Sequence, residues 1–280
     1  MRKQDRRRPA AFPEEQDVSD SWISSRTENG VGVIALDRPE VLNALSPGMV
    51  TAFSAALHAM TEPGSGVRAL VVTGAGRAFC SGASLSEGDG NAVTTTRAQG
   101  VLQQVYHPFL RALRDCPVPV VTAVNGPAVG AGMSVALMGD IITCARSAYF
   151  LQAFRRIGLV PDCGSSWLLP RLVGQARARE LSLLGEKLSA ETALEWGLVN
   201  RVYDDATFMD DTMALARQLA DGPVRALGRI RRLYWQSPVN GFEDQLNLED
   251  ELQFAATFDP EAAEGVAAFR EKRPADFRKV

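Results

Sequence analysis

The sequence predicts an α/β core followed by a helical C-terminal region, and three observations indicate this fold class. Short apolar runs rich in β-branched residues end at glycine, asparagine or proline, as buried strands do. Segments with apolar residues at three- and four-residue spacing follow these runs, as expected of helices that cover a sheet. After about residue 165, the helical pattern continues almost to the C-terminus.

A strand–turn–helix unit occurs three times in the first half of the chain, at 31–60, 69–115 and 118–138. Each strand ends where turn residues begin, the first two helices present one apolar face, and the third consists mostly of small residues. Pro47 stands early in its helix, a position that proline favours. The predicted elements are strand 31–36, helix 47–60, strand 69–73, helix 97–115, strand 118–124, helix 130–137 and strand 141–145.

The second half is predicted to be helical except for a short strand at 198–203. The helices are expected at 174–184, 189–196, 206–221, 223–236, 242–257 and 260–270. We therefore divide the chain into three parts. Residues 1–20 are charged and nearly free of large apolar side chains, which is typical of a disordered tail. Residues 21–205 form the core, and residues 206–280 form a C-terminal helical region.

Composition excludes several classes of function. With 280 residues, 46% of them hydrophobic, the chain can fill a sizeable core, and its net charge of -3 favours neither nucleic acid nor anionic membranes as partners. No apolar run approaches the roughly 18 residues of a membrane span. No apolar segment follows the basic start, so a cytoplasmic protein with reduced cysteines is expected. Two distant histidines, His58 and His107, make a structural zinc site improbable.

Two glycine-rich turns follow predicted strands, at 73–84 and 124–133. Such turns expose backbone N–H groups, and those at the start of a helix have no partner within the helix. They can bind an anion or a developing oxyanion. Neither turn has the spacing of a nucleotide-binding loop, and the chain has no G-x-S-x-G nucleophile elbow. Either turn alone could simply be a tight-packing turn.

Several motifs together resemble those of the enoyl-CoA hydratase/isomerase, or crotonase, family. They are ALDRPEVLNAL (35–45), GAGRAFCSGASL (74–85), AVNGPAVGAGMSVAL (123–137), GLVPDCGSSWLLPRLVG (158–174), AETALEWGLVNRVY (190–203) and EGVAAFREKRP (264–274). The resemblance extends over about residues 20 to 275. It implies an α/β spiral of ββα units with a C-terminal helical subdomain that assembles as a homotrimer or a hexamer made of two trimers.

The resemblance also implies an acyl-CoA thioester substrate and no separate cofactor, since coenzyme A is part of the substrate. The thioester oxygen is expected between the backbone amides of Ala83 and Ala131. The matching positions for CoA and acyl-group binding are Arg38, Val41, Ala44, Ser81, Gly82, Leu85, Gly130, Ser134 and Phe154. Phe269 and Lys272, near the C-terminus, are further candidates to cover CoA.

Two glutamates activate water in the hydratases of this family. Here the matching positions hold Ser134 and Phe154, which cannot supply both a base and an acid. Asp162, after Pro161, instead resembles the aspartate of a branch that contains phenylacetyl-CoA ring-epoxide isomerases, some enoyl-CoA isomerases and 4-chlorobenzoyl-CoA dehalogenases. An aspartate after proline is otherwise a common turn or helix-capping residue.

These observations favour an enoyl-CoA isomerase in which Asp162 carries the proton from one carbon to another. The alternatives are an enoyl-CoA hydratase with a displaced base and a non-catalytic protein that binds CoA esters. His107 could line the acyl pocket, although such a histidine is more often a packing residue. Glu87 and Asp89 could supply a second acid, although a solvated loop is the simpler interpretation.

Overall fold

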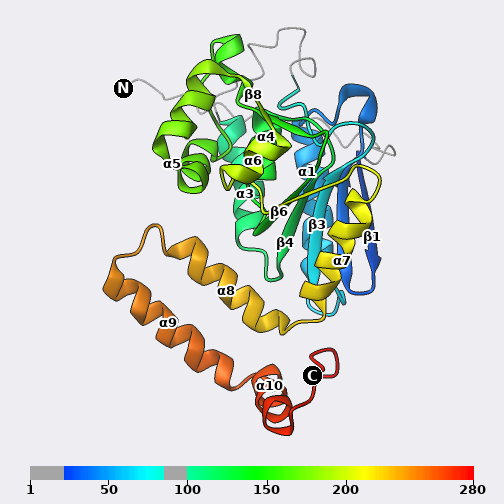
Figure 1. Cartoon of the computed structure of the whole chain (residues 1–280), viewed down its shortest axis with the longest axis vertical. Helices are drawn as coiled ribbons and strands as arrows, with labels where there is room; N and C mark the ends of the chain where they lie inside the picture. The colour runs from blue at the N-terminus through cyan, green and yellow to red at the C-terminus, as the bar shows by residue number, and fades with distance from the viewer. Residues whose placement is uncertain (1–21, 85–99) are drawn as a thin grey trace, which may run out of the picture.

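The computed structural model describes residues 22–84 and 100–280, and its centre is a six-stranded sheet in the order β1-β2-β3-β4-β6-β9 (Figure 1). The edge strand β1 pairs antiparallel with β2, and every other neighbouring pair is parallel. The strands are β1 (Ile23–Glu28), β2 (Val31–Leu36), β3 (Ala69–Gly74), β4 (Val120–Val124), β6 (Ile141–Ala145) and β9 (Arg201–Tyr203).

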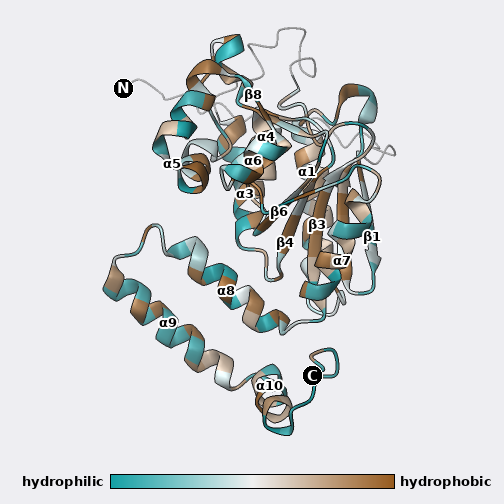
Figure 2. Ribbon diagram, in the orientation of Figure 1, coloured by the Kyte–Doolittle hydropathy of each residue, from teal (hydrophilic) through white to brown (hydrophobic). Residues whose placement is uncertain are grey.

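The central strands are apolar because helices cover the sheet on both sides. Every residue of β2, β3 and β4 is buried, and these strands are rich in valine, isoleucine and leucine. In Figure 2 the hydrophobic colour is concentrated on β3, β4 and β6. In Figure 1, α7 (Phe208–Ala220) crosses in front of the sheet and α1 (Pro47–Thr61) lies behind it. The strand predictions at 31–36, 69–73, 118–124 and 141–145 are confirmed.

A second sheet of three strands, in the order β5-β7-β8, borders the first. The strand β5 pairs parallel with β7, which pairs antiparallel with β8. Its strands are β5 (Ala128–Val129), β7 (Tyr149–Leu151) and β8 (Lys187–Ser189). These strands and β1 were not predicted. They have two or three residues each, apart from β1, whose burial pattern has five exposed residues out of six. The apolar stretches of β5 and β7 are too short to indicate a strand by pattern alone.

The helix expected at 97–115 is described from Gly100 onward and changes type within its length. Residues Leu102–Tyr106 (η2) form a π-helical segment, which continues into α3 (His107–Arg114). Pro108 has no N–H and cannot make the helical bond to the carbonyl four residues earlier. The preceding His107 N–H reaches back five residues to Leu102, so the wider turn is accommodated next to the proline.

The helix predicted at 174–184 begins earlier than expected. Helix α5 spans Ser165–Leu184, and Gly174 (φ 80°, ψ 162°) interrupts its helical geometry, so the predicted helix is only its second segment. The first segment starts directly after Cys163 and Gly164, both of which have positive φ. The remaining helices of the core are α4 (Ala131–Ala136) and α6 (Ala190–Glu195), with short 3₁₀ segments η1 (Pro39–Val41) and η3 (Ala153–Ile157).

Three C-terminal helices stand away from the core (Figure 1): α8 (Val224–Gln236), α9 (Phe242–Thr257) and α10 (Pro260–Glu271). Arg231 of α8 is buried and attaches this helix to the core, because its guanidinium donates to Asp140 and to the carbonyls of Leu113 and Cys116. Glu261 of α10 accepts hydrogen bonds from the first N–H groups of α8. The helix predictions at 206–221, 223–236, 242–257 and 260–270 are confirmed.

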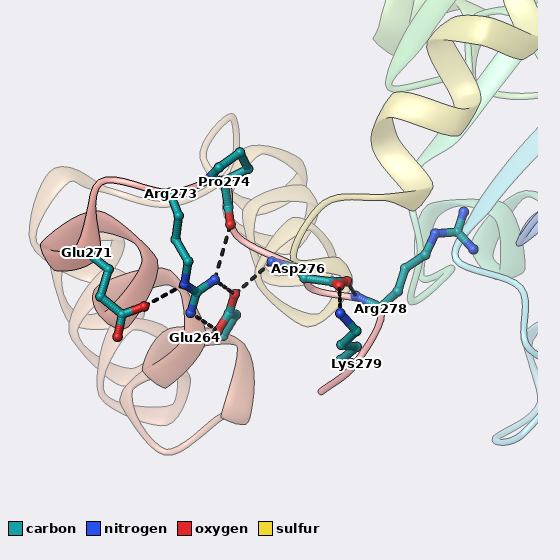
Figure 3. A network of polar contacts seen from close by, with 7 residues as sticks. All are labelled: Glu264, Glu271, Arg273, Pro274, Asp276, Arg278 and Lys279. Carbon is teal, nitrogen blue, oxygen red and sulfur yellow. Dashed lines mark hydrogen bonds and ion pairs between the residues drawn. The ribbon is translucent and has the colours of Figure 1, made fainter.

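The C-terminal segment returns from α10 to the core through a network of ion pairs (Figure 3). Arg273 makes a two-pronged contact with Glu264 at 2.7 and 2.9 Å, and this contact lowers the pKa of Glu264 to about 2. Arg278 then contacts Asp221 at the end of α7 and the carbonyl of Asn29. The domain division at residue 206 stays a prediction, and α7 itself packs on the six-stranded sheet. Within the described residues, no helix is long and apolar enough to cross a membrane.

Candidate active site

A parallel β-bridge between Leu45 and Ala83 fixes the position of the first glycine-rich turn. Leu45 donates to the Gly82 carbonyl at 2.7 Å and accepts from the Ser84 N–H at 2.7 Å. Both bonds use the neighbours of Ala83. In this pattern the N–H of Ala83 itself points away from Leu45 and is available to another acceptor.

The second glycine-rich turn ends where α4 begins. The N–H of Gly130 donates to the Leu151 carbonyl at 2.8 Å, and the Ser134 N–H returns to the Gly130 carbonyl at 3.1 Å. Gly130 has a φ of 53° and a ψ of -123°, which glycine adopts far more readily than other residues. Ala131 is the first helical residue, so its amide has no acceptor within α4.

The two turns lie against each other. A second parallel bridge joins Cys80 to Ala128, with hydrogen bonds of 2.9 and 3.1 Å. A Cβ placed on Gly82 would lie 3.0 Å from the Val129 carbonyl oxygen and 3.8 Å from the Ala131 nitrogen. The segment that carries Ala83 is thereby brought next to the start of α4 at Ala131.

Asn43 was not singled out in the sequence, and it organises this region. It is fully buried, and its side-chain amide donates to the carbonyls of Ala75 and Ala78 at 2.9 and 2.8 Å. Its side-chain oxygen accepts from the Arg38 N–H at 2.8 Å. Asn43 also has a φ of 56°, a left-handed conformation that asparagine tolerates better than most residues. This one side chain joins segment 38–45 to the first glycine-rich turn.

A cavity of about 190 Å³ opens in front of the two amides. Its described lining is mostly apolar, with Tyr106 and Asp162 as its large polar members. The Tyr106 hydroxyl donates to the Leu45 carbonyl at 3.1 Å. Of the lining residues that the structure describes, Asp162 is the only one with a carboxyl group. These residues are Pro47, Ala83, Ser84, Val101, Leu102, Tyr106, Ala131, Leu159, Val160, Asp162 and Cys163.

Asp162 lies in the loop before α5, and its carboxyl group is largely withdrawn from water. Its Oδ1 atom is buried and has no hydrogen-bond partner among the described residues. Burial raises the pKa of Asp162 above its ordinary value of 3.8, although a hydrogen bond from the Cys163 thiol and the charge of His107 lower that pKa in part. Burial therefore places an unsatisfied proton acceptor at the cavity wall.

Ser134 and Phe154, the two positions expected to face the acyl group, have different surroundings. Ser134 is fully buried, and its hydroxyl contacts two backbone oxygens, that of Asp162 at 3.1 Å and that of Gly130 at 3.3 Å. It thus connects α4 to the loop that carries Asp162. Phe154 is also buried, and its ring would meet a Cβ on Gly130 at 3.8 Å, but it does not line the 190 Å³ cavity.

The segment expected to bind CoA runs beside the first turn. The Ser81 N–H donates to the Leu42 carbonyl at 2.9 Å, and its hydroxyl contacts the Val41 carbonyl at 3.3 Å. Ala44 follows in the same loop, where its N–H bonds the Val41 carbonyl at 3.2 Å. The Arg38 side chain contacts Glu40 at 3.3 Å and lies over the Trp22 ring at 5.1 Å from its centroid.

Other candidate residues are dispersed. Leu85, Glu87 and Asp89 lie outside the described residues. His107 begins α3 and acts on Asp162 through its charge. Phe269 is 85% exposed, and Lys272 follows α10 with a φ of 54°. In the described part of the chain, no group of three or more His, Cys, Asp or Glu side chains is placed to hold a metal ion.

Comparisons with known proteins agree with this arrangement. The family model described as Enoyl-CoA hydratase/isomerase matches residues 26–279. The chain belongs to this family. It is 42% identical to 1,2-epoxyphenylacetyl-CoA isomerase of Escherichia coli K12 over 257 residues, which cover 91% of this chain and 98% of the relative. It is 44% identical to the "Probable enoyl-CoA hydratase" of Rhodobacter capsulatus over 255 residues, with 91% and 97% covered.

The fold agrees with solved structures of the family. An enoyl-CoA hydratase from Polaromonas sp. JS666 superposes with a TM-score of 0.84 at 33% identity, over 91% of this chain and 98% of that one. The chain therefore has the α/β crotonase fold with C-terminal helices, as predicted, and the family implies an acyl-CoA substrate. Relatives with isomerase and hydratase names stand at nearly equal identity, so the family alone leaves the reaction undetermined.

Proposed function

We propose that this protein is an enoyl-CoA isomerase in which Asp162 carries a proton between two carbons of the acyl group. One observation carries the proposal: the described lining of the cavity has a single carboxyl group, and it lies in the same cavity as the two free amides. Its buried Oδ1 has no partner, and the pKa of Asp162 is raised by burial. Such a group can accept a proton from the substrate and return it.

The reaction needs no other group. In a 3-enoyl thioester, the carboxylate of Asp162 takes the proton from C2, and the electron pair delocalises into a dienolate. The amides of Ala83 and Ala131 donate to the thioester oxygen, which gains negative charge in this step. Asp162 then delivers the proton to C4, so that the double bond moves to C2–C3 and the carboxylate is restored. Each preorganised donor of this kind is worth about 10²–10³ in rate.

Hydration requires both a base and an acid, because water must be deprotonated while the α-carbon is protonated. The positions that match the two hydratase glutamates are Ser134 and Phe154. Ser134 bonds backbone oxygens, and Phe154 lies outside the 190 Å³ cavity lining. A hydratase with a displaced base and a non-catalytic CoA-ester-binding protein are the two other outcomes that the test below distinguishes.

Coenzyme A is proposed to lie along Arg38, Val41 and Ala44 on one side and Ser81 and Gly82 on the other. The support is that hydrogen bonds from Ser81 hold these two segments together beside the cavity. A guanidinium suits phosphate oxygens, so we assign a phosphate contact to Arg38.

A homotrimer or a hexamer is proposed for the assembly, with α8–α10 as the oligomerisation region. The support is the number of aromatic side chains that these helices leave in solvent, more than a monomer usually exposes. Phe242, Phe254, Phe258 and Phe269 are each at least 65% exposed. Mass measurement in solution tests this assembly.

The proposed reaction is tested by following the absorbance of the conjugated enoyl thioester. The isomerase predicts that a 3-enoyl-CoA gains this absorbance and that Asp162→Asn abolishes the gain while CoA-ester binding persists. Loss of absorbance from a 2-enoyl-CoA would instead support a hydratase. Binding of both esters with no change in absorbance would support the non-catalytic protein.

A further inference from the structure

Tyr106 lines the 190 Å³ cavity, and the reaction proposed above gives it no role. Its side chain is buried, with 6% of the residue exposed, and its hydroxyl donates to the Leu45 carbonyl at 3.1 Å. A buried hydroxyl normally has a hydrogen-bond partner, because a missing partner costs free energy. Here the partner is the backbone of the segment that borders the first glycine-rich turn.

Leu45 holds the segment that carries the Ala83 amide. Its N–H donates to the Gly82 carbonyl, and its carbonyl accepts from the Ser84 N–H, both at 2.7 Å. These two bonds lie on either side of Ala83, so the direction of the Ala83 N–H follows the position of the Leu45 peptide. A displacement of Leu45 would turn this amide away from the thioester oxygen.

The Leu45 carbonyl receives two donors. A carbonyl oxygen has two lone pairs, and the Ser84 N–H and the Tyr106 hydroxyl both donate to this one. Ser84 belongs to the glycine-rich turn itself, whereas Tyr106 lies 61 positions along the chain from Leu45. The phenol therefore fixes the carbonyl relative to the helical wall of the cavity, which the turn cannot do alone.

The helix that carries Tyr106 has an unusual geometry at this point. The π-helical segment η2 ends at Tyr106, and the His107 N–H closes its wide turn on the Leu102 carbonyl. Both ends of the segment, Leu102 and Tyr106, line the cavity. Turns of the π type are rare and are frequently found at functional sites. The geometry of this turn sets the direction of the Tyr106 side chain.

The second amide has a separate support. The Gly130 N–H donates to the Leu151 carbonyl at 2.8 Å, and the Ser134 N–H donates to the Gly130 carbonyl at 3.1 Å. These bonds involve neither Tyr106 nor Leu45. Loss of the phenolic hydroxyl should therefore disturb the first glycine-rich turn more than the start of α4.

We propose that Tyr106 is a positioning residue of the oxyanion site: its hydroxyl holds the Leu45 carbonyl and thereby directs the Ala83 amide at the thioester oxygen. Tyr106 acts through Leu45 and forms no bond with the substrate. The inference rests on the proposed function for the place of the thioester oxygen, which must lie at the amides of Ala83 and Ala131.

Tyr106→Phe removes the hydroxyl and keeps the ring, so the cavity keeps its apolar wall. The kcat for a 3-enoyl-CoA should fall about tenfold, the scale of one neutral hydrogen bond, while KM stays close to that of the wild type. Tyr234→Phe removes the hydroxyl of a tyrosine of α8 that is 76% exposed, and it should change neither constant. A wild-type kcat in Tyr106→Phe would overturn the inference.

Hydrogen exchange separates positioning from a general loss of structure. In the protein without substrate, Tyr106→Phe should speed the exchange of the backbone amides at residues 82–84 and leave those at 131–134 nearly unchanged. Equally faster exchange in both segments would mean that Tyr106 supports the fold as a whole. A fall in kcat with unchanged exchange at 82–84 would mean that the hydroxyl contacts the substrate. Either result would overturn the positioning role.

The decisive experiment observes the thioester carbonyl without turnover. Butanoyl-CoA labelled with carbon-13 at the carbonyl cannot isomerise, and donation from two amides lowers its carbonyl stretching frequency in the infrared. The wild type and Tyr234→Phe should show the full shift on binding, and Tyr106→Phe a smaller one. The full shift in Tyr106→Phe would refute the role of Tyr106. Absence of any shift in the wild type would refute the oxyanion site and the inference with it. Because the ester is saturated, neither result depends on whether the protein is an isomerase.

Discussion

Gly132→Ala should damage catalysis more than it damages folding. Gly132 is the second residue of α4, directly after the Ala131 amide. A Cβ at this position would lie 2.4 Å from the Cys80 carbonyl oxygen and 2.7 Å from its Cβ and Sγ atoms. Because the obstructing atoms include backbone, the two glycine-rich turns must separate.

The size of the effect follows from these distances. Carbon atoms pack at about 3.5–4.0 Å, so the turns must move apart by about 1 Å. A misplacement of that size costs about 10²-fold in rate, and complete loss of one oxyanion donor costs about 10²–10³. Overpacking of this kind destabilises a protein by about 1–3 kcal/mol. We expect kcat to fall about 100-fold.

Steady-state kinetics on a 3-enoyl-CoA, together with urea unfolding, measures both effects. The loss should appear in kcat more than in KM, because the two amides act mainly on the negative charge that develops on the thioester oxygen during the reaction. Gly265→Ala in α10 is the control, since a Cβ there meets only Phe277, at 3.7 Å. A Gly132→Ala protein with wild-type kcat would refute the assignment of the Ala131 amide.

Four further predictions concern Asp162, its surroundings and α8. The base form of Asp162 is needed, so kcat/KM should fall as pH drops through the pKa that burial has raised above 3.8. Because burial raises this pKa in the folded protein, ionisation of Asp162 destabilises the fold as pH rises through it. Urea unfolding should therefore show Asp162→Asn to be more stable than the wild type at pH 7, and the difference should close below pH 3.8. Ser134→Ala removes the bond to the Asp162 carbonyl and should lower kcat about tenfold with an unchanged KM for the 3-enoyl-CoA; an unchanged kcat would contradict its positioning role. Arg231→Met leaves Asp140 buried without its partner and should cost about 3–5 kcal/mol in urea unfolding, whereas a loss below 1 kcal/mol would contradict the anchoring of α8.

The sequence predicted the buried strands and the long helices, because their apolar patterns reflect direct contact with the core. The short strands β5, β7 and β8 were missed, since pairing partners far along the chain define them. Strand β1 pairs with the next strand, β2, across a turn at Asn29 and Gly30, so here a local Asn-Gly hairpin signal was available and was not used. The interruption of α5 at Gly174 is a matter of backbone conformation, which the hydrophobic pattern does not indicate.

For the site, the resemblance to the family led to Ala83, Ala131 and Asp162, and all three line one cavity of the structure. Ser134 instead bonds the backbone of the Asp162 loop, which no linear pattern could indicate. Asn43 was also missed, because its importance comes from bonds to carbonyls more than 30 positions away. Asparagine between two apolar residues in LNAL, a polar group in an apolar context, was the available signal.

The most direct test of the central claim follows one proton. A 3-enoyl-CoA with deuterium at C2 is given to excess wild-type enzyme and to Asp162→Asn for a single turnover, and the product is examined by NMR. If Asp162 alone carries the proton, the wild-type product contains deuterium at C4, and the variant forms no product. Product from Asp162→Asn at the wild-type rate, or wild-type product in which C4 carries only solvent hydrogen, would contradict the account.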